Sequence, residues 1–352
     1  MFITGCLNSF LISEKWGSVR KIRFKTQVKS LIDYACSHDG SNLDYSDIKK
    51  IIEEDRAQRE TVRLQITQSG PRRALEQLGN ESSKVYSPLI QDNIAFGKGI
   101  GIFSIKNQRI VCSEEARKIR ELLQKQPTEL EKLLLPIVLD SKYRAYLYFL
   151  ANLDRLGGEL RIPFAYRKRT VSSGIKTFLI AKGFATDVAS FFTVRDLLYD
   201  FGLINWRVTP EESVEEIYLT SKMVENGTKS NDAYLEEVQL KKCSLLINKS
   251  ITDETFVDAL EKCYLSKSGG NYGSIVDLLE LRDMVCPVLG ISDNQFNIRL
   301  LEIYHKQVAL EVELSQGRVS PRRFSGLLIK AVNTIKIEER VYATYIRLRR
   351  RY

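Results

Sequence analysis

The sequence predicts a mainly α-helical protein with small β-hairpins, divided into several domains. Three observations predict this class. The 352 residues exceed the roughly 100–200 residues of one domain. Most segments carry apolar residues at helical spacing, and short apolar runs beside glycine or asparagine predict strands between the helices. The hydrophobic content is 43%, and no apolar run approaches the roughly 18 residues of a membrane helix. We therefore expect neither a disordered nor an integral membrane protein.

The N-terminal domain, residues 1–126, is predicted to hold short helices and a hairpin. Ser113 is a good N-cap for a helix over 114–124, because its hydroxyl can accept a hydrogen bond from the first turn. The glycine-rich stretch 97–101 predicts the tip of a hairpin, and 107–109 predicts another turn. Further helices are expected over 19–36, 45–54 and 72–78, whereas 60–67 fits either a helix or a strand.

The middle domain, residues 127–225, continues the same pattern. We expect its elements in the order helix, extended piece, two helices and a strand, over 143–156, 159–166, 171–181, 188–200 and 203–208. An acidic amphipathic stretch, 211–225, ends this domain. The polar residues 226–232 predict a linker, and 233–266 predicts a helix within the connector 226–273.

The C-terminal domain, residues 274–352, carries the clearest pattern. A helix is expected over 274–289, and the sharp turn Leu-Gly-Ile-Ser separates it from a helix over 293–307. Ser292 and Gln295 have the spacing of a capping box. Alternating apolar and acidic residues predict a half-buried strand over 308–314, with further strands over 332–338 and 341–348.

This order of helix, turn, helix and strands over about 275–348 resembles the winged helix-turn-helix superfamily, and 1–126 and 128–225 resemble it more weakly. The resemblance implies tandem winged-helix domains. It also implies that the helix 292–306 enters a DNA major groove and that the loop 318–330 is a wing lying against phosphates. The layout is similar to tandem winged-helix DNA-recognition subunits of prokaryotic regulatory or defence systems, which is a fold-level analogy.

The charge distribution indicates a polyanionic partner. The formal net charge is +9, and two blocks, 141–182 and 317–352, hold most of the excess of Lys and Arg, while the remainder is acidic. Localised positive potential of this kind attracts nucleic acid. The alternative is that each block is a solvated face balanced in space by distant acids.

We expect the DNA contacts to come from polar and basic side chains in four places. They are Asn294, Gln295, Asn297, Arg299 and Lys306 on the second C-terminal helix; Arg318, Arg322, Arg323 and Lys330 in the wing; Arg161, Arg167, Lys168, Arg169, Lys176 and Lys182 in the middle block; and Arg349, Arg350 and Arg351 in the tail. Two alternatives stay open. Asp293 and Glu302 weaken the attraction of the helix to DNA, and the middle arginines can instead pair with the acidic residues 211–216.

Catalytic motifs are weak. The sequence 97–101 lacks the spacing of a phosphate-binding loop. Asp140 and Lys142 have the spacing of a metal-dependent nuclease, but no upstream metal-binding acid accompanies them. Arg299 and His305 match a helical RNase pattern that is common by chance, and the six cysteines include no CxxC pair. We expect no catalytic centre, cofactor or metal.

The expected function is therefore non-catalytic recognition of double-stranded DNA, with other protein subunits or a second copy as further partners. The alternative is a protein-interaction scaffold, a subunit of a larger nucleic-acid-processing or defence complex. The scattered cysteines and the absence of a recognisable secretory signal predict a cytoplasmic protein without a membrane partner.

Overall fold

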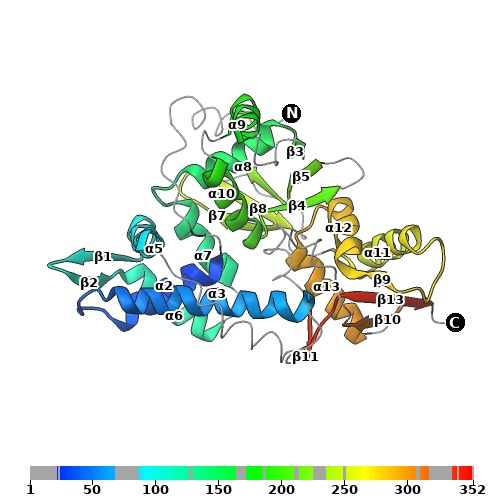
Figure 1. Cartoon of the computed structure of the whole chain (residues 1–352), viewed down its shortest axis with the longest axis horizontal. Helices are drawn as coiled ribbons and strands as arrows, with labels where there is room; N and C mark the ends of the chain where they lie inside the picture. Colours follow the sequence, from blue (N-terminus) through cyan, green and yellow to red (C-terminus); the bar gives the residue numbers. More distant parts are fainter. Residues whose placement is uncertain are drawn as a thin grey trace. The chain divides into compact units, whose positions relative to one another are not determined.

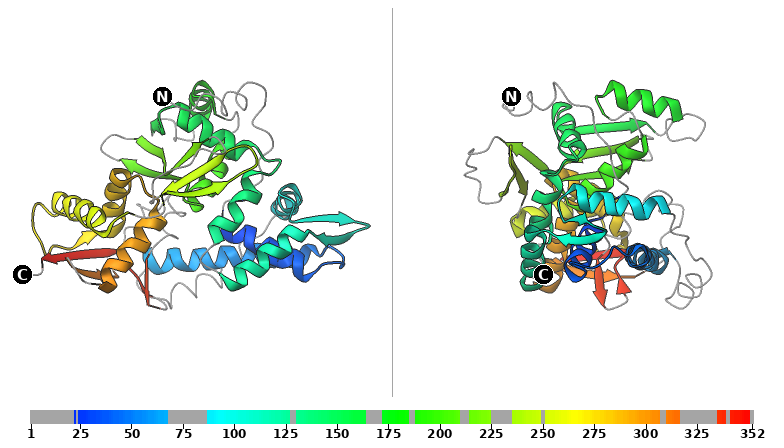
Figure 2. Two further views of the ribbon diagram at one scale, coloured as in Figure 1. Left: turned by 180° about the vertical axis from the view of Figure 1, so that it is seen from behind. Right: turned by 90° about the vertical axis from the view of Figure 1, so that its left-hand side faces the viewer.

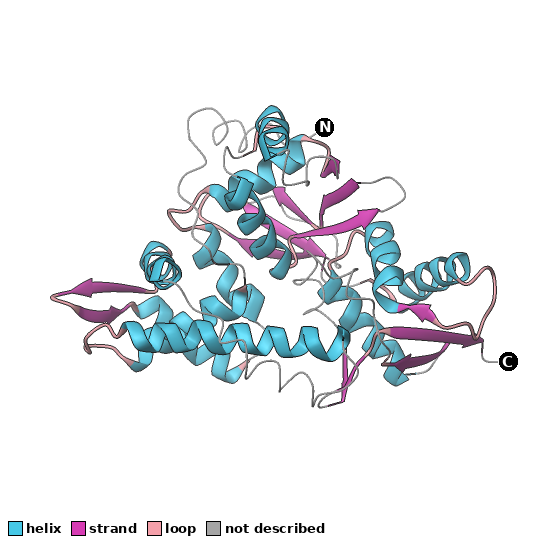
Figure 3. Cartoon of the chain, in the orientation of Figure 1, coloured by secondary structure: helices cyan, strands magenta, loops and turns pink. Residues whose placement is uncertain are grey.

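A computed structural model describes the protein at residues 22, 24–67, 87–126, 130–163, 172–184, 188–209, 214–224, 235–248, 251–306, 310–316, 335–338 and 341–350. Helices predominate, and the strands form small antiparallel sheets (Figures 1 and 3). The chain divides into two compact units, Met1–Asp55 with Lys84–Ile247, and Arg56–Ser83 with Asn248–Tyr352. In the described part of the chain, no helix is both long and apolar enough to cross a membrane.

The described residues of the N-terminal part form four helices and a tight hairpin. The helices are α2 (Lys25–Ser37), α3 (Tyr45–Thr67), α5 (Ser87–Gly99) and α6 (Glu114–Lys125), and the strands are β1 (Phe103–Lys106) and β2 (Arg109–Cys112). The two strands are antiparallel, and the predicted turn at Asn107 and Gln108 joins them. Ser113 caps α6, as predicted, because its hydroxyl accepts a hydrogen bond from the Ala116 N–H at 3.1 Å.

Two predictions for this part are wrong. The short helix predicted over 45–54 is the start of α3, which continues through 60–67 as one helix. The predicted hairpin tip at 97–101 is instead the end of α5 and the turn that follows it. The glycines serve packing here: a Cβ on Gly97 would lie 2.5 Å from the Phe103 ring, and one on Gly99 would overlap the Tyr143 ring. Residues 72–78 lie outside the described residues.

The middle part follows the predicted order. It contains α7 (Leu130–Leu139), α8 (Ala145–Arg155), β3 (Glu159–Pro163), α9 (Ser172–Ala181), α10 (Val188–Asp200), β4 (Ile204–Thr209) and β5 (Val214–Leu219). The strands form an antiparallel sheet in the order β3-β5-β4, in which Ile217 faces both Leu160 and Trp206. Phe149, Phe184 and Phe191 pack against one another in the core of this part, with ring centroids 5.1–5.3 Å apart.

The first unit ends in a second three-stranded sheet, in the order β6-β8-β7. Its strands are β6 (Ser221–Val224), β7 (Leu235–Gln239) and β8 (Ser244–Asn248). The helix predicted over 233–266 is therefore wrong in its first half, and only α11 (Asp253–Lys267) is helical. The physical reason is sheet pairing, because Leu245 and Leu246 on β8 pair with Met223 and Lys222 on β6.

The second unit is built around α11, α12 and α13. Its elements after α11 are β9 (Val276–Asp277), α12 (Leu278–Leu289), α13 (Asp293–Lys306), β10 (Leu310–Ser315), β11 (Lys336–Glu338), β12 (Val341–Tyr342) and β13 (Tyr345–Arg350). The main sheet has the order β10-β13-β9. The helix predicted from 274 begins at Leu278, because the Asp277 side chain accepts hydrogen bonds from the Leu279 and Glu280 N–H groups and caps the helix there. Figure 2 shows β10 and β13 side by side in this unit.

Candidate nucleic-acid interface

Helix α13 buries one face and leaves the opposite face accessible. Phe296, Leu300 and Ile303 are buried at the three- and four-residue spacing of a single helical face. On the other side, Ile298 is 49% exposed and Lys306 is exposed as well. Only four of the fourteen residues of α13 are buried, so the helix presents an outer surface to a partner.

The predicted capping box holds the start of α13. The Ser292 N–H donates to Gln295 Oε1 at 2.9 Å, and the Gln295 N–H donates to Ser292 Oγ at 3.3 Å. Gly290 has a φ of +62°, which permits the turn between α12 and α13. The side-chain oxygen of Gln295, a predicted DNA contact, is thus engaged in capping, while Asn294 beside it is half-buried.

A buried ion pair joins α12 to α13. Arg282 Nη2 lies 3.1 Å from Asp293 Oδ2, and the two side chains are only 2% and 0% exposed. Arg282 Nη1 also donates to Asn297 Oδ1 at 3.3 Å. These contacts set the position of α13 against α12, and they engage Asn297, another predicted DNA contact, within the unit.

The cations of α13 pair with acids near the surface. Arg299 contacts Glu302 at 2.5 Å and Asp253 at 3.3 Å, and Lys306 contacts Asp253 at 2.9 Å. The hydrogen bond from Lys306 is the main cause that lowers the pKa of Asp253. The Arg299 side chain is only 19% exposed, whereas Lys306 and Asp253 are 52% and 48% exposed. An exposed pair such as Lys306–Asp253 contributes only about 0–1 kcal/mol, so a phosphate can replace that carboxylate at small cost.

The tail arginines lie on β13 and are also paired. Arg349 contacts Glu313 of β10 at 3.1 Å. Arg350 contacts Glu261 of α11 at 3.4 Å and lies over the Tyr272 ring at 5.0 Å. Arg349 and Arg350 are therefore balanced locally by acids from neighbouring elements.

In the middle block, the described cations are partly paired. Arg161 lies 3.1 Å from Glu216 on β5, which is the pairing with the acidic residues 211–216 that one interpretation expected. Lys176 and Lys182 are exposed, and Lys182 lies over the Phe178 ring at 5.9 Å. The remaining predicted contacts fall outside the described residues: Arg167, Lys168, Arg169, Arg318, Arg322, Arg323, Lys330 and Arg351.

Helix α10 has the same place in its element order as α13, but it is mostly buried. Eight of its thirteen residues are buried. Among them is Arg195, whose guanidinium stacks on Trp206 at 4.3 Å and pairs with Asp196 and Glu215. A helix covered in this way cannot enter a groove of DNA, so its role is to hold the core of the middle part.

The hairpin β1–β2 presents two exposed cations that sequence reasoning did not select. Lys106 ends β1, Arg109 begins β2, and the two residues are paired across the hairpin. Both residues line one hollow of the surface together with Asp39 and Asn107. The signal in the sequence was the Lys-Asn-Gln-Arg order around the turn predicted over 107–109.

The nuclease pattern at Asp140 has a structural explanation. Both Asp140 carboxylate oxygens accept the Lys241 N–H, at 3.0 and 3.1 Å, and Lys142 lies over the Tyr143 ring. Asp140 is not the cap of α8, which begins only at Ala145. Across the described ranges, no group of three or more His, Cys, Asp and Glu side chains is arranged to hold a metal ion.

Comparisons with known proteins add no relative. No family model matches the chain. No curated protein matches it, and no solved structure matches it.

Proposed function

We propose that this protein is a non-catalytic DNA-binding protein built from tandem winged-helix domains, and that it engages duplex DNA through α13. The observation that carries this proposal is the accessible outer face of α13, a helix whose start and packing are fixed by a capping box and a buried ion pair. A rigid helix with one accessible face suits insertion into a major groove.

The element order supports the winged-helix assignment. In the second unit the order is α11, β9, α12, α13, β10, the small separate sheet of β11 and β12, and β13, and the last strand lies in the middle of the main sheet. In the first unit the order is α8, β3, α9, α10, β4 and β5, and again the last strand is central. This shared order of helix, strand, two helices and two strands is that of a winged helix.

The two domains would have different roles. The accessible helix α13 reads DNA, whereas the buried helix α10 supports the middle domain and leaves contact with phosphates to surface cations such as Lys176 and Lys182. Tandem domains on one chain raise the affinity for a common DNA through effective concentration.

Binding of a labelled duplex, measured by fluorescence anisotropy at about 50 and 200 mM salt, tests the proposal. The test variant is Arg299→Gln/Lys306→Gln. The matched control is Lys29→Gln/Lys49→Gln, which removes two exposed lysines that form i,i+4 ion pairs in the first unit. Each lost phosphate contact lowers the slope of log affinity against log salt by about 0.9, so the test variant should lose about 1.8. Wild-type protein that does not bind at 50 mM salt, or a test variant equal to the control, would refute it.

A protein-interaction scaffold is the second candidate. It is favoured by the exposed apolar side chains Val288 and Ile298 on α12 and α13, and by the acids Glu302 and Asp253 that compete with phosphates. This function predicts a stable complex with another protein that survives high salt, with no duplex binding by the purified chain.

A further inference from the structure

We infer that the hairpin β1–β2 of the first unit is a second contact surface for the phosphate backbone of duplex DNA, used without reading base sequence. The inference rests on the proposed function and adds a surface that the charge blocks of the sequence did not indicate. It is carried by the two cations at the hairpin tip, Lys106 and Arg109.

The two cations face each other directly. Lys106 and Arg109 are cross-strand partners in the register of the hairpin, and both are exposed. Like charges placed opposite each other destabilise a hairpin. This pair therefore lowers the stability of the isolated chain and concentrates positive charge at an exposed tip. An anionic partner explains why such an arrangement is present.

Neither cation has a counter-ion among the described residues. Several other basic residues of the same part do have one, because Arg117 pairs with Asp39, Lys118 with Glu114, and Arg120 with Asp33. The exposed Lys98 and Lys125 also have no ion pair among the described residues, but they are not placed opposite a second cation. Asp39 lines the same hollow as the two tip cations, but its carboxylate is engaged. It accepts the Cys112 N–H at 2.8 Å and contacts Arg117 at 2.5 Å.

The hairpin is held at its turn and along the start of β2. The Gly40 N–H donates to the Ile110 carbonyl at 2.8 Å, the Ile110 N–H donates to the Ser41 carbonyl at 2.9 Å, and the Leu43 N–H donates to the Gln108 carbonyl at 3.1 Å. These bonds add the connection between α2 and α3 to the hairpin as a third, short strand. The tip cations are therefore presented on a rigid support, which lowers the entropy cost of binding.

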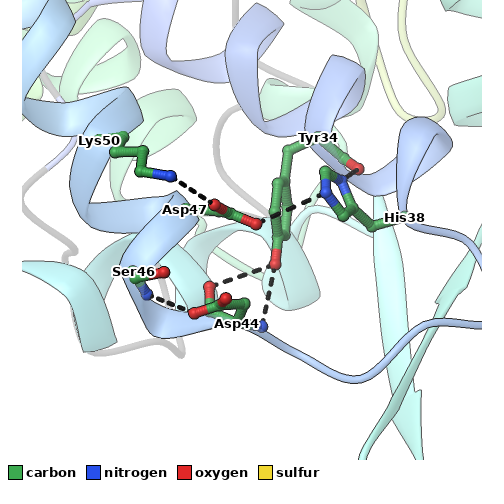
Figure 4. Close-up of polar contacts among 6 residues, drawn as sticks. All are labelled: Tyr34, His38, Asp44, Ser46, Asp47 and Lys50. Carbon is green, nitrogen blue, oxygen red and sulfur yellow. Dashed lines mark hydrogen bonds and ion pairs between the residues drawn. The ribbon is translucent and has the colours of Figure 1, made fainter.

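That connection is itself fixed by a cluster of side chains (Figure 4). The Asp44 N–H donates to the Tyr34 hydroxyl at 3.2 Å, and that hydroxyl donates to the Asp44 carbonyl at 3.3 Å. His38 stacks on the Tyr34 ring at 4.5 Å, and its Nε2 lies 3.5 Å from Asp47. The Ser46 N–H donates to Asp44 Oδ1 at 2.7 Å, which ties the cluster to the start of α3.

The turn residues add hydrogen-bonding groups to the tip. Asn107 and Gln108 have φ of +48° and +63°, the left-handed region that a two-residue hairpin turn requires and that glycine occupies most easily. Both residues are exposed. Two polar side chains in place of glycine put amide donors between the two cations, and such donors commonly contact phosphate oxygens.

The hairpin extends beyond the helices beside it in the views of Figures 1 and 2. A projecting hairpin can lie along a nucleic-acid backbone without bringing the rest of its domain into a groove. Because the two cations meet phosphates and no base edges are read by them, their contribution should be the same for unrelated DNA sequences.

The test compares Lys106→Gln/Arg109→Gln with the control Lys29→Gln/Lys49→Gln and with wild type, on two duplexes of unrelated sequence, by anisotropy between about 50 and 200 mM salt. Loss of two phosphate contacts lowers the salt slope by about 1.8, so the fold-change in affinity across this fourfold salt range should shrink about 12-fold on both duplexes. Thermal unfolding of the hairpin variant should match wild type or exceed it, since the substitution removes a like-charge pair.

The outcomes separate this inference from the proposed function. If the wild type binds DNA and the hairpin variant has the same affinity and salt slope as the control, the inference about the hairpin is overturned. The proposed role of α13 is unaffected by that outcome. An effect on only one of the two duplexes also overturns it, because the contact would then depend on sequence. Wild-type protein that binds neither duplex at 50 mM salt overturns both.

Discussion

Replacing Asp293 by asparagine tests the buried link between α12 and α13. The substitution keeps the size of the side chain and removes its charge. It leaves the Arg282 guanidinium, only 2% exposed, without its carboxylate partner at 3.1 Å. A cation left in such a place cannot recover its hydration, so the folded state alone is destabilised.

The expected loss follows from the surroundings of Arg282. Removing one partner of a buried pair costs about 3–5 kcal/mol. Arg282 keeps the hydrogen bond to Asn297, so the lower end of this range, about 3 kcal/mol, applies. For a unit of this size, each kcal/mol lowers the melting temperature by about 4 °C, which gives a decrease of about 12 °C.

Thermal unfolding followed by circular dichroism measures this decrease in melting temperature. Because a chain of two units need not unfold in one step, hydrogen exchange of the backbone amides in α12 and α13 is needed to assign the decrease to the second unit. The control is Asp253→Asn, which removes an acid from a pair with Lys306 whose side chains are 48% and 52% exposed. That change should cost less than about 1 kcal/mol.

A double variant, Arg282→Met/Asp293→Leu, removes both charges of the pair. It therefore separates the cost of losing the ion pair from the cost of leaving the Arg282 charge uncompensated. Apolar side chains of similar size often restore or improve stability where a buried ion pair is removed whole. The double variant should therefore melt well above Asp293→Asn. The reasoning fails if Asp293→Asn melts with the control, or if the double variant is no more stable than the single one.

Two other predictions concern the first unit. Cys36 Sγ lies 3.0 Å from Cys112 Sγ. Treatment with a small-molecule disulfide should therefore join the two residues in an internal disulfide and release two reduced small thiols. Mass spectrometry should show that the protein loses about 2 Da, and the internal disulfide should not form in Cys36→Ser. Burial is the main cause that raises the pKa of Cys36 to about 12. Below that pKa, the thiolate fraction and the rate of disulfide formation should rise about tenfold per pH unit. A rate of disulfide formation that stays constant between about pH 7 and 9 would contradict this prediction. Gly97→Ala should lower the free energy of unfolding, measured in urea, by about 1–3 kcal/mol, because the new Cβ would meet the Phe103 ring. The control is Gly101→Asn, at a positive φ with open space around the residue, which should lower it by less than half as much.

Local signals in the sequence predicted two helix starts correctly. The Ser113 cap and the Ser292–Gln295 capping box depend on residues three positions apart, and both form as predicted. The turn at Asn107 and Gln108 is equally local. Each of these features is decided by the backbone geometry of a few neighbouring residues, and such geometry is written directly in the sequence.

The errors come from contacts distant in the sequence. Gly97 and Gly99 read as a turn, but they are small because the rings of Phe103 and Tyr143 occupy the space of a side chain. The predicted helix over 233–266 failed because β8 pairs with β6, about twenty residues earlier. Nothing within the segment itself specifies that pairing.

The candidate site was predictable only in outline. The polar and basic side chains of α13 are visible in the sequence, but their partners are not: Asp253 pairs with Arg299 and Lys306 from a helix more than forty residues earlier. The burial of α10 was partly visible, because its sequence is mostly apolar, but the burial of Arg195 and Asp196 within it depends on partners from other elements.

The element order alone does not assign a function to each domain, because α10 and α13 have the same place in similar orders and different surroundings. Aromatic rings and a buried arginine surround α10, which makes it part of a core. Helix α13 keeps an accessible face, and in the proposed function Lys306 would exchange one exposed carboxylate for a phosphate at small cost. The hairpin cations have no described carboxylate to exchange, so they offer their full charge to a polyanion. The pairing of the cations, together with the burial of the helix, therefore indicates where DNA would bind on this chain.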